Sequence, residues 1–288
     1  MSLARSVAAS PFKLTRIYSV PVVLTLFGIL PGTAAAWGPQ GHRVAGLLAE
    51  EYLCPNAAAA VRDLWPRGGL AAAGKWPDQI RGQSRWEHAR PWHYINVPDT
   101  GPWPPATRSP DGDVLWAIDH FASILSSDGH DRRQKREALA FVAHFVADLH
   151  QPLHVGREAD RGGNDIRVTG SAGGDQNLHR YWDTTVITAV QPDPRSYARA
   201  VAPLAVGHVQ FWQSTAPREW GRESFDLRPV VYDFESRSGA ITLGPAYAER
   251  AETTARMRLA QAGVRLAGML DQLLGQGGTG CAASNAAE

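Results

Sequence analysis

A histidine and an aspartate lie four residues apart near the middle of this 288-residue chain, within the segment AHFVADLHQPLH at residues 143–154. If this segment is helical, His144 and Asp148 share one face, because residues four apart lie one above the other. An imidazole and a carboxylate placed in this way are typical ligands of a divalent metal ion. His154 follows Pro152, which ends or kinks a helix, so the chain can turn back toward the same space. Taken alone, the pair fits a helix with solvated polar residues equally well.

The same spacing recurs downstream at His179 and Asp183, and other candidate residues precede the central pair. Asp78 lies in the segment WPDQIR, where Pro77 favours the start of a helix. Capping of that helix is the alternative role for Asp78. Arg81 lies one turn later on the same face, where a guanidinium suits a planar clamp on phosphate.

Residues 90–98 read as an extended segment that contains a histidine and a tyrosine. His93 is either a core histidine or a ligand, whereas Tyr94 offers a face on which a nucleic-acid base can stack. A glycine-rich loop at residues 156–177 contains Asn164, and its glycines would let the backbone approach a ligand closely. This loop matches no phosphate-binding or dinucleotide fingerprint.

The elements that position these residues are predicted to be mainly helices. Apolar residues recur at three- and four-residue steps over residues 132–150, so one face of that helix should be buried. Other helices are predicted at residues 44–53, 57–64, 113–127, 196–214, 227–234 and 244–274. Residues 99–113 are rich in Pro, Gly and Asp and predict a loop. Beyond Asp183 we expect no chemical motif, and Glu219, Glu223 and Asp233 should be ordinary surface residues.

The first 36 residues differ from the rest. They contain three basic residues and no acidic one, an apolar run at residues 20–30, and a final Ala34-Ala35-Ala36. This is the pattern of a secretory signal peptide. The apolar run is short for a membrane anchor, which is the alternative, and no other segment is long and apolar enough to cross a membrane. We therefore expect an exported protein whose mature domain is residues 37–288.

Cleavage after Ala36 would make Trp37 the first mature residue, with His42 close behind it. A free α-amino group is a nitrogen ligand once deprotonated, and together with its own carbonyl oxygen it can chelate a metal. A frayed terminus is the alternative. Cys54 and Cys281 are the only cysteines, so they can pair in an exported protein but cannot form a cysteine-rich zinc site.

Composition limits how such a protein can bind phosphates. Hydrophobic residues make up 44% of the chain and charged residues 20%, as in a soluble globular protein. Without the three basic residues of the signal segment, 26 basic residues face 28 acidic ones, a net charge of −2. A protein that binds nucleic acid by general phosphate neutralisation is usually basic. Any action on phosphates must therefore come from a local site.

Nine candidate ligands can be collected, all of them nitrogen or oxygen donors. They are the Trp37 amine, His42, Asp78, His93, His144, Asp148, His154, His179 and Asp183. This donor set, without thiolate, suits Zn2+ in a catalytic setting where open positions remain for water. Nine ligands are too many for one tetrahedral ion and suit two or three.

The combined pattern resembles the S1/P1 nuclease family, which is similar in fold to zinc-dependent phospholipase C. The shared motifs are a mature N-terminal Trp, a nearby His, W-x-D-x-x-R, H-[FY]-[IV]-[DN], H-x-x-x-D-x-x-x-x-x-H ending in Q-P-L-H, and H-x-x-x-D. All occur here in order between Trp37 and Asp183. The resemblance implies a mainly helical, all-α single domain with three zinc ions at the base of a cleft.

By matching position, the resemblance also implies a role for each ligand. One zinc ion would be bound by Asp78, His93 and His144, with Asp148 bridging to a neighbouring ion. That neighbour would be held by the Trp37 amine and carbonyl and by His42. The third ion would be held by His154, His179 and Asp183. Asp78, Arg81 and Asp148 would then serve catalysis, in which a metal-activated hydroxide attacks phosphorus while Arg81 neutralises a phosphate oxygen.

The implied activity is that of an exported endonuclease that cuts single-stranded RNA and DNA to 5′-nucleotides and also acts on 3′-nucleotides. Asn96 stands where many relatives carry Asp in the base pocket, so base preference stays open, although Tyr94 keeps a stacking face. Asn164 is a further candidate for substrate contact. No stable protein partner is implied, and no membrane after signal cleavage. The alternatives are a phospholipase C and a zinc-binding protein without catalysis.

Overall fold

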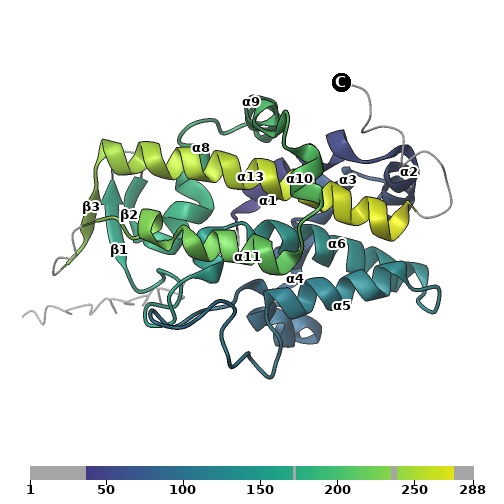
Figure 1. The fold of residues 1–288 in the computed structure, drawn as a ribbon, viewed down its shortest axis with the longest axis horizontal. Helices are drawn as coiled ribbons and strands as arrows, with labels where there is room; N and C mark the ends of the chain where they lie inside the picture. Colours follow the sequence, from purple (N-terminus) through teal and green to yellow (C-terminus); the bar gives the residue numbers. More distant parts are fainter. Residues whose placement is uncertain (1–36, 171–172, 235–238, 276–288) are drawn as a thin grey trace, which may run out of the picture. The chain divides into compact units, whose positions relative to one another are not determined.

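The computed structural model describes residues 37–170, 173–234 and 239–275, all of them within one compact unit. The predicted signal peptide and Cys281 lie outside the described residues. The fold is mainly helical, with one small three-stranded sheet at one end (Figure 1). The predicted fold class is therefore confirmed. Within the described residues, no helix combines the length and hydropathy needed to cross a membrane.

The longer α-helices are α1 Pro39–Tyr52, α2 Pro55–Leu64, α5 Val114–Ser126, α6 Arg132–Leu149, α9 Pro194–Val201, α11 Pro217–Asp226 and α13 Pro245–Leu274. Shorter α-helices are α3 Gly69–Ala73, α4 Trp76–Ile80, α7 Leu178–Arg180, α8 Val186–Thr188, α10 Val209–Gln213 and α12 Arg228–Val231. Other helical turns are η1 Ser84–His93, η2 Pro152–Val155, η3 Tyr181–Thr185 and η4 Ala202–Ala205. The strands are β1 Arg167–Gly170, β2 Gly173–Asn177 and β3 Ile241–Leu243.

Helix α6 is the central element, and its sequence defines its beginning. Asp131 accepts a hydrogen bond from the Gln134 backbone N–H, while the Gln134 side chain accepts one from the Asp131 backbone, which forms a capping box. From Ala138 to Leu149 every residue is buried, because α5, α3, α4 and α13 pack around this half. A helix buried on all sides cannot leave polar residues unpartnered, so His144 and Asp148 require partners inside the protein.

Helix α13 runs the length of the described unit and packs on α1 (Figure 1). The two backbones approach closely at Gly263, where an added Cβ would lie 2.4 Å from Cβ of Leu48. Glycine permits this approach because it has no side chain. The close packing fixes α1, which carries His42, against the rest of the core.

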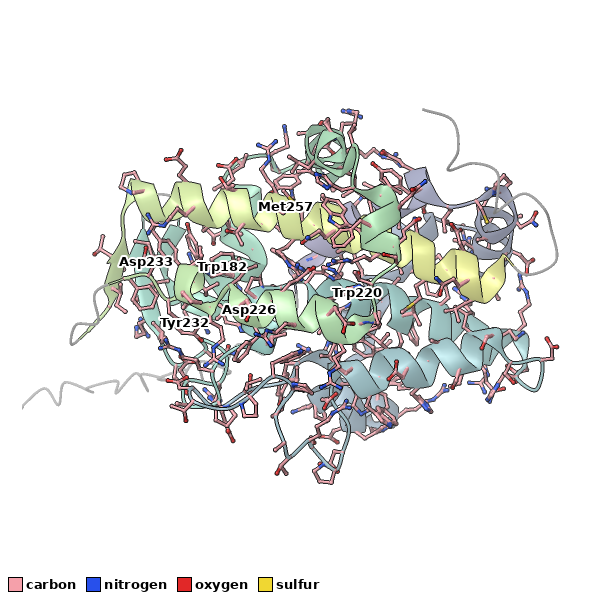
Figure 2. The ribbon with its side chains drawn as sticks, in the orientation of Figure 1. Trp182, Trp220, Asp226, Tyr232, Asp233 and Met257 are labelled. Atoms are coloured by element: carbon pink, nitrogen blue, oxygen red, sulfur yellow. The ribbon has the colours of Figure 1, made fainter. Side chains whose placement is uncertain are left out.

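An ionic cluster of two buried arginines and one half-buried glutamate joins α6, α11 and α13. Glu223 accepts hydrogen bonds from Arg265 at 2.6 and 2.7 Å and from Arg258 at 2.5 Å. Arg265 also contacts the ring of His150, the residue that ends α6. The ring of Trp220 on α11 (labelled in Figure 2) lies tilted to the His150 ring, with centroids 5.6 Å apart. Glu223 was expected to be an ordinary surface residue, and this was wrong. Sequence periodicity does not reveal that two arginines on α13 are buried and need a counter-charge.

The sheet has the strand order β2-β1-β3. Strands β1 and β2 form an antiparallel hairpin, and β3 joins β1 in parallel. The glycine-rich segment at residues 156–177 was predicted to be a loop, so its C-terminal part was predicted wrongly. The hairpin is short and polar, and it lacks the apolar alternation by which strands are recognised.

Two other element predictions need correction. The helix predicted at residues 196–214 is broken into α9, η4 and α10. Pro203 cannot donate a backbone hydrogen bond to a continuing helix, and Gly207 has a positive φ of 77°, which is not helical. Residues 90–98 are extended only from Tyr94, since η1 continues to His93. Helix α11 was not predicted at all.

Candidate metal centre

The site is assembled from five segments that converge on the C-terminal half of α6. Its ligand atoms fall into three groups, in each of which all atoms lie within 4.8 Å of one another. The groups are Asp78 with His93 and His144; His42 with His144 and Asp148; and His154 with His179 and Asp183. All eight predicted side-chain ligands are therefore brought together, and none lies elsewhere.

The first group combines α4, the end of η1 and α6. Nε2 of His144 lies 2.9 Å from Nδ1 of His93 and 3.9 Å from Oδ1 of Asp78. Three donors at these separations leave space for one small cation between them. Asp78 lies in the first turn of α4, but its carboxylate faces the histidines, so capping is not its main role.

The second group places α1 against α6. Nε2 of His42 lies 3.4 Å from Oδ1 of Asp148, and the His42 ring stacks on the His144 ring with centroids 3.9 Å apart. The other carboxylate oxygen, Oδ2, lies 3.0 Å from Nδ1 of His93. The two oxygens of Asp148 therefore face different histidines, as expected of a carboxylate that bridges two cations.

The third group lies just beyond the end of α6. Nε2 of His154 is 3.7 Å from Oδ1 of Asp183, and Nε2 of His179 is 3.4 Å from Oδ2. Gln151 donates a hydrogen bond of 2.6 Å to Oδ1 of Asp183 and thereby orients this carboxylate. Gln151 was not among the predicted site residues, although its place in the Q-P-L-H motif was a signal that could have identified it.

Backbone carbonyl groups fix the orientation of three histidines. Nδ1 of His144 donates to the Gly74 oxygen at 2.7 Å, Nδ1 of His154 to the His93 oxygen at 2.6 Å, and Nδ1 of His179 to the Gly162 oxygen at 2.6 Å. Each bond sets the tautomer that leaves Nε2 unprotonated and directed into the site. This is the usual support for a histidine that ligates a metal.

Gly162 has a positive φ of 64°, and an added Cβ would lie 2.5 Å from the Leu153 carbonyl oxygen. Any other residue would displace this backbone and with it the carbonyl that holds His179.

The buried polar atoms of the site are suited to binding cations. Several buried ligand atoms have no hydrogen-bond partner among the described residues; they are Nε2 of His42, Oδ1 of Asp78, Oδ1 of Asp148, Nε2 of His154 and Nε2 of His179. An unpaired buried polar atom is costly, and so many directed at one space indicate a missing binding partner. Imidazole and carboxylate donors without thiolate suit zinc in an open, catalytic site.

Burial and mutual charge shift the pKa values of the metal-free site in opposite directions. Burial alone would raise the Asp148 pKa, but the imidazoles of His144 and His154 outweigh it and hold the pKa well below its usual range. Burial raises the pKa of Asp183 to about 8, against the opposing effect of His179. Burial, aided by the charge of Arg81, lowers the pKa of His93 to about 3. His144 differs from the other histidines of the site: burial acts to lower its pKa, but the charges of Asp148 and Asp78 raise it overall. A metal bound at His144 must therefore displace a proton, whereas the other histidines are already in the neutral form that binds metal.

Trp37 is fully buried, and its neighbour Gly38 donates a 2.7 Å hydrogen bond to the Asp183 carbonyl. The chain is therefore held against the third group at this point. The chelating role of its amine stays a prediction.

The most exposed part of the site is at α4. The side chains of Asp78 and Arg81 are 18% and 16% exposed and lie 3.8 Å apart, whereas those of the other ligands are almost fully buried. Arg81 therefore stands where a phosphate would approach the centre.

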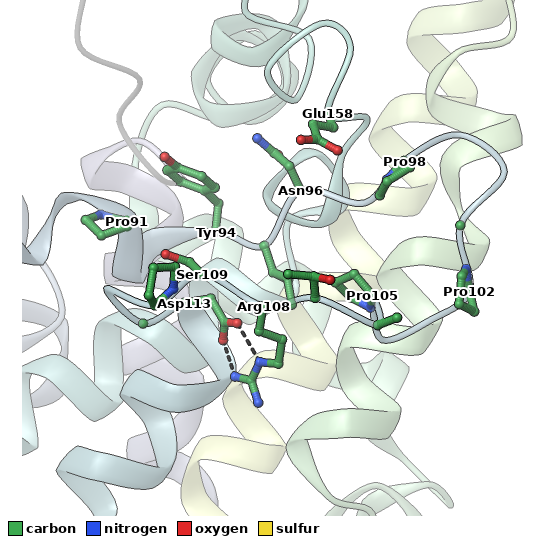
Figure 3. A pocket seen from close by; sticks show the side chains of 16 residues that line it. Pro91, Tyr94, Asn96, Pro98, Pro102, Pro105, Arg108, Ser109, Asp113 and Glu158 are labelled. Atoms are coloured by element: carbon green, nitrogen blue, oxygen red, sulfur yellow. Dashed lines mark hydrogen bonds and ion pairs between the residues drawn. The ribbon is translucent and has the colours of Figure 1, made fainter.

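A pocket of about 600 Å³ lies beside the centre and is lined by Tyr94 and Asn96 (Figure 3). Glu158 lies near Asn96, and the ion pair of Arg108 with Asp113 closes the opposite side (Figure 3). Rigid prolines and a few polar groups make it suited to a flat ring with hydrogen-bonding edges. Glu158 and Arg108 were not predicted as lining residues, because no motif includes them.

Asn164 does not line this pocket. Its side-chain amide donates to the Arg161 carbonyl at 2.8 Å and accepts a long hydrogen bond from Asn177. These bonds stabilise the turn, so the structure offers no support for a substrate contact at Asn164.

Comparison with known proteins agrees with this geometry. The family described as S1/P1 Nuclease matches residues 37–275. The chain belongs to the S1/P1 nuclease family. The match begins at Trp37 and includes every residue of the three ligand groups.

Several relatives match this chain over most of its length and over most of their own. Endonuclease 4 of Arabidopsis thaliana is 31% identical, covering 87% of this chain and 93% of the relative. Nuclease P1 of Penicillium citrinum is 26% identical, covering 83% of this chain and 98% of the relative. Nuclease S1 of Aspergillus oryzae is 24% identical, covering 83% of this chain and 92% of the relative. As a member of a nuclease family, the protein is a nuclease-type hydrolase with three metal-binding clusters.

Proposed function

We propose that this protein is a zinc-dependent endonuclease that hydrolyses single-stranded RNA and DNA to 5′-nucleotides and also removes the phosphate of 3′-nucleotides. The observation that supports it most is that three ligand groups gather around the C-terminal half of α6, with Arg81 at the exposed side. Nine ligands with an adjacent guanidinium suit three ions that act on a phosphate, since a storage site needs no phosphate clamp.

Bound zinc would supply Lewis acidity and water of lowered pKa at neutral pH. The protein's own residues provide position and charge. Arg81 can form paired hydrogen bonds to the non-bridging phosphate oxygens and neutralise them. Asp148 faces histidines of two ligand groups, His42 and His93, and Asp183 is oriented by Gln151.

Substrate choice would depend on the neighbouring pocket. Tyr94 is 41% exposed, so a base that is unpaired can stack on its ring. A base in a duplex is already stacked and cannot enter, which supports a preference for single strands. The Asn96 amide both donates and accepts, so it can bind the edge of a stacked base at any pH.

We further propose that residues 1–36 direct export and are removed, leaving a periplasmic or secreted protein that begins at Trp37. The composition of that segment and the start of the family match at Trp37 support this. The zinc-loaded protein beginning at Trp37 should be assayed on single-stranded RNA, single-stranded DNA, a duplex and phosphatidylcholine. Cleavage of the single strands is expected. Faster hydrolysis of phosphatidylcholine would favour a phospholipase C, and zinc binding without any hydrolysis would favour a binding protein.

A further inference from the structure

A second, smaller pocket lies apart from the base pocket, between α1, α3 and the start of α9. Its volume is about 120 Å³, and three of its lining residues are cationic: Arg43, Lys75 and Arg195. The remaining lining residues are small or apolar, and no carboxylate is among them. A small pocket with three positive charges is complementary to a single phosphate group.

The three positive charges of this pocket have no counter-ion in direct contact among the described residues. Over the described part of the chain, none of the three residues forms an ion pair. Glu50 is close enough for the charge of Arg195 to act on it, but it forms no ion pair with Arg195. Its carboxylate accepts a 2.6 Å hydrogen bond from the Leu70 backbone N–H in α3. Bringing like charges together without a partner costs free energy, which a bound anion would offset.

The pocket and the metal centre are connected through neighbouring residues of the chain. Lys75 immediately precedes α4 and is three residues before Asp78, a separation of about 5 Å along a helix. The residue before Lys75, Gly74, supplies the carbonyl that holds His144. Arg43 follows His42 in α1. These connections through α1 and through the segment before α4 are the basis for placing one strand across both Arg81 and this pocket.

A partly apolar groove continues from the basic pocket. This second cavity of about 340 Å³ shares Leu47, Gly68, Ala71 and Arg195 with the pocket and extends over Leu53, Ala58 and Val61. Glu50 and Arg62 also line it, one of each charge. A phosphate site beside an apolar surface matches the alternation of phosphate and base along a single strand.

We propose that Arg43, Lys75 and Arg195 form a second phosphate subsite that binds the backbone of a single-stranded polynucleotide outside the metal centre. The proposal rests on the proposed nuclease function. It explains how a chain with a mature net charge near zero can bind a polyanion, because the attraction is local. The subsite contributes to affinity for long strands and not to the turnover of a mononucleotide.

The test compares the zinc-loaded protein with the double variant Arg43→Ala/Arg195→Ala and with Arg195→Ala alone. Arg199→Ala is the matched control, because Arg199 is an exposed arginine on the same helix that does not line the pocket. The probe is a fluorescein-labelled 12-nucleotide phosphorothioate strand, and its Kd is measured by anisotropy at several salt concentrations. Hydrolysis of a 3′-mononucleotide and zinc content are measured in parallel.

We expect the double variant to bind the strand about 10-fold more weakly. The slope of log Kd against log salt should become shallower by about 0.7 for each phosphate that the variant no longer neutralises. Mononucleotide turnover and zinc content should stay at the control level, and Arg195→Ala should lie between the control and the double variant.

Three results would overturn the subsite. The first is that the double variant binds the strand with the same affinity and the same salt slope as the wild type. The second is that inorganic phosphate displaces the labelled strand as well as an unlabelled strand does, and the third is that binding to phosphatidylserine vesicles depends on Arg43 and Arg195 as much as strand binding does. Failure of the proposed function would look different. The wild-type protein would then cleave no strand, while binding through Arg43 and Arg195 would still be measurable.

Discussion

Nε2 of His144 lies 3.1 Å from Oδ2 of Asp148, one helical turn later on α6. The helix fixes this distance through its pitch, independently of any bound ion. The same carboxylate faces His93 with Oδ2 and His42 with Oδ1, and those histidines belong to distant segments. Asp148 is therefore the residue through which two ligand groups are joined.

Asp148→Asn should abolish phosphodiester cleavage, with a loss of at least ~100-fold, because a bridging charge is removed from two metal positions. Asn96→Ala should reduce the rate far less, since Asn96 lies in the base pocket and belongs to no ligand group. Rates on single-stranded RNA should be measured for both variants at equal zinc loading. Similar residual rates would argue against the bridging role.

The purified mature protein should contain about three zinc ions per chain, one for each ligand group. Chelation should lower the melting temperature by about 10 °C, because the ions bind the folded state and join segments that are far apart in sequence. Elemental analysis and thermal unfolding with and without EDTA check both statements. Full activity with one ion or fewer would contradict the assignment.

The ligands could be predicted from sequence because their spacing reflects local geometry. Residues four apart share a helix face wherever that helix lies, so His144 with Asp148 and His179 with Asp183 were recognisable in advance. The supporting hydrogen bonds could not be predicted in this way. That Gly74 and Gly162 offer carbonyl groups to histidines, or that Lys75 and Arg195 line one pocket, depends on the packing of distant segments. The polar hairpin was missed because its stability comes from pairing and not from an apolar pattern.

Glu223→Gln should destabilise the protein by roughly 2–4 kcal/mol at neutral pH, because the buried Arg258 and Arg265 lose their counter-charge. The lower part of this range is favoured by the 35% exposure of Glu223. Burial acts to raise the Glu223 pKa, but the hydrogen bond from Arg265 and the two positive charges lower it overall. A carboxyl with a lowered folded-state pKa contributes stability above its unfolded pKa of about 4.3 and loses it as pH falls through the folded pKa.

The difference in unfolding free energy between wild type and Glu223→Gln should therefore shrink as pH falls below about 4. Denaturant unfolding of both proteins in EDTA, between about pH 3 and 7, measures this difference while the metal ligands are common to both. Glu219→Gln on the same helix is the control, since Glu219 makes no ion pair among the described residues. A difference that is constant with pH would exclude the charge as the cause.

Cys54 and Cys281 are predicted to form a disulfide in the exported protein. Cys54 is buried at the start of α2, and its backbone N–H donates to the Asp271 side chain on α13 at 2.9 Å. Cys281 follows Asp271 by only ten residues, a length of chain that easily spans the distance. Thiol titration of the unfolded, unreduced protein should find no free thiol. Two free thiols would refute the pairing.

The final prediction concerns the first mature residue. Trp37 should act through its backbone, because a free amine and carbonyl are the groups that chelate a metal. Its indole is buried in the core and Gly38 is held against the Asp183 carbonyl, so the backbone at Trp37 is anchored beside the third group. A residue in front of Trp37 converts the amine into an amide, whose nitrogen has no lone pair available for a metal. Cleavage of the signal segment would then be a condition for activity, and the precursor would be harmless to nucleic acid inside the cell.

Two proteins test this, one beginning at Trp37 and one with Gly-Ser placed before it, with both termini confirmed by mass spectrometry. The extended protein should lose about one zinc ion and at least ~100-fold in rate, as expected when a catalytic metal is lost. Its fold should be retained, because the other eight ligands and the packing of α1 on α13 do not involve the amine. Near-identical circular dichroism spectra would establish this. Equal zinc content and equal rate in the two proteins would exclude the N-terminus from the metal centre.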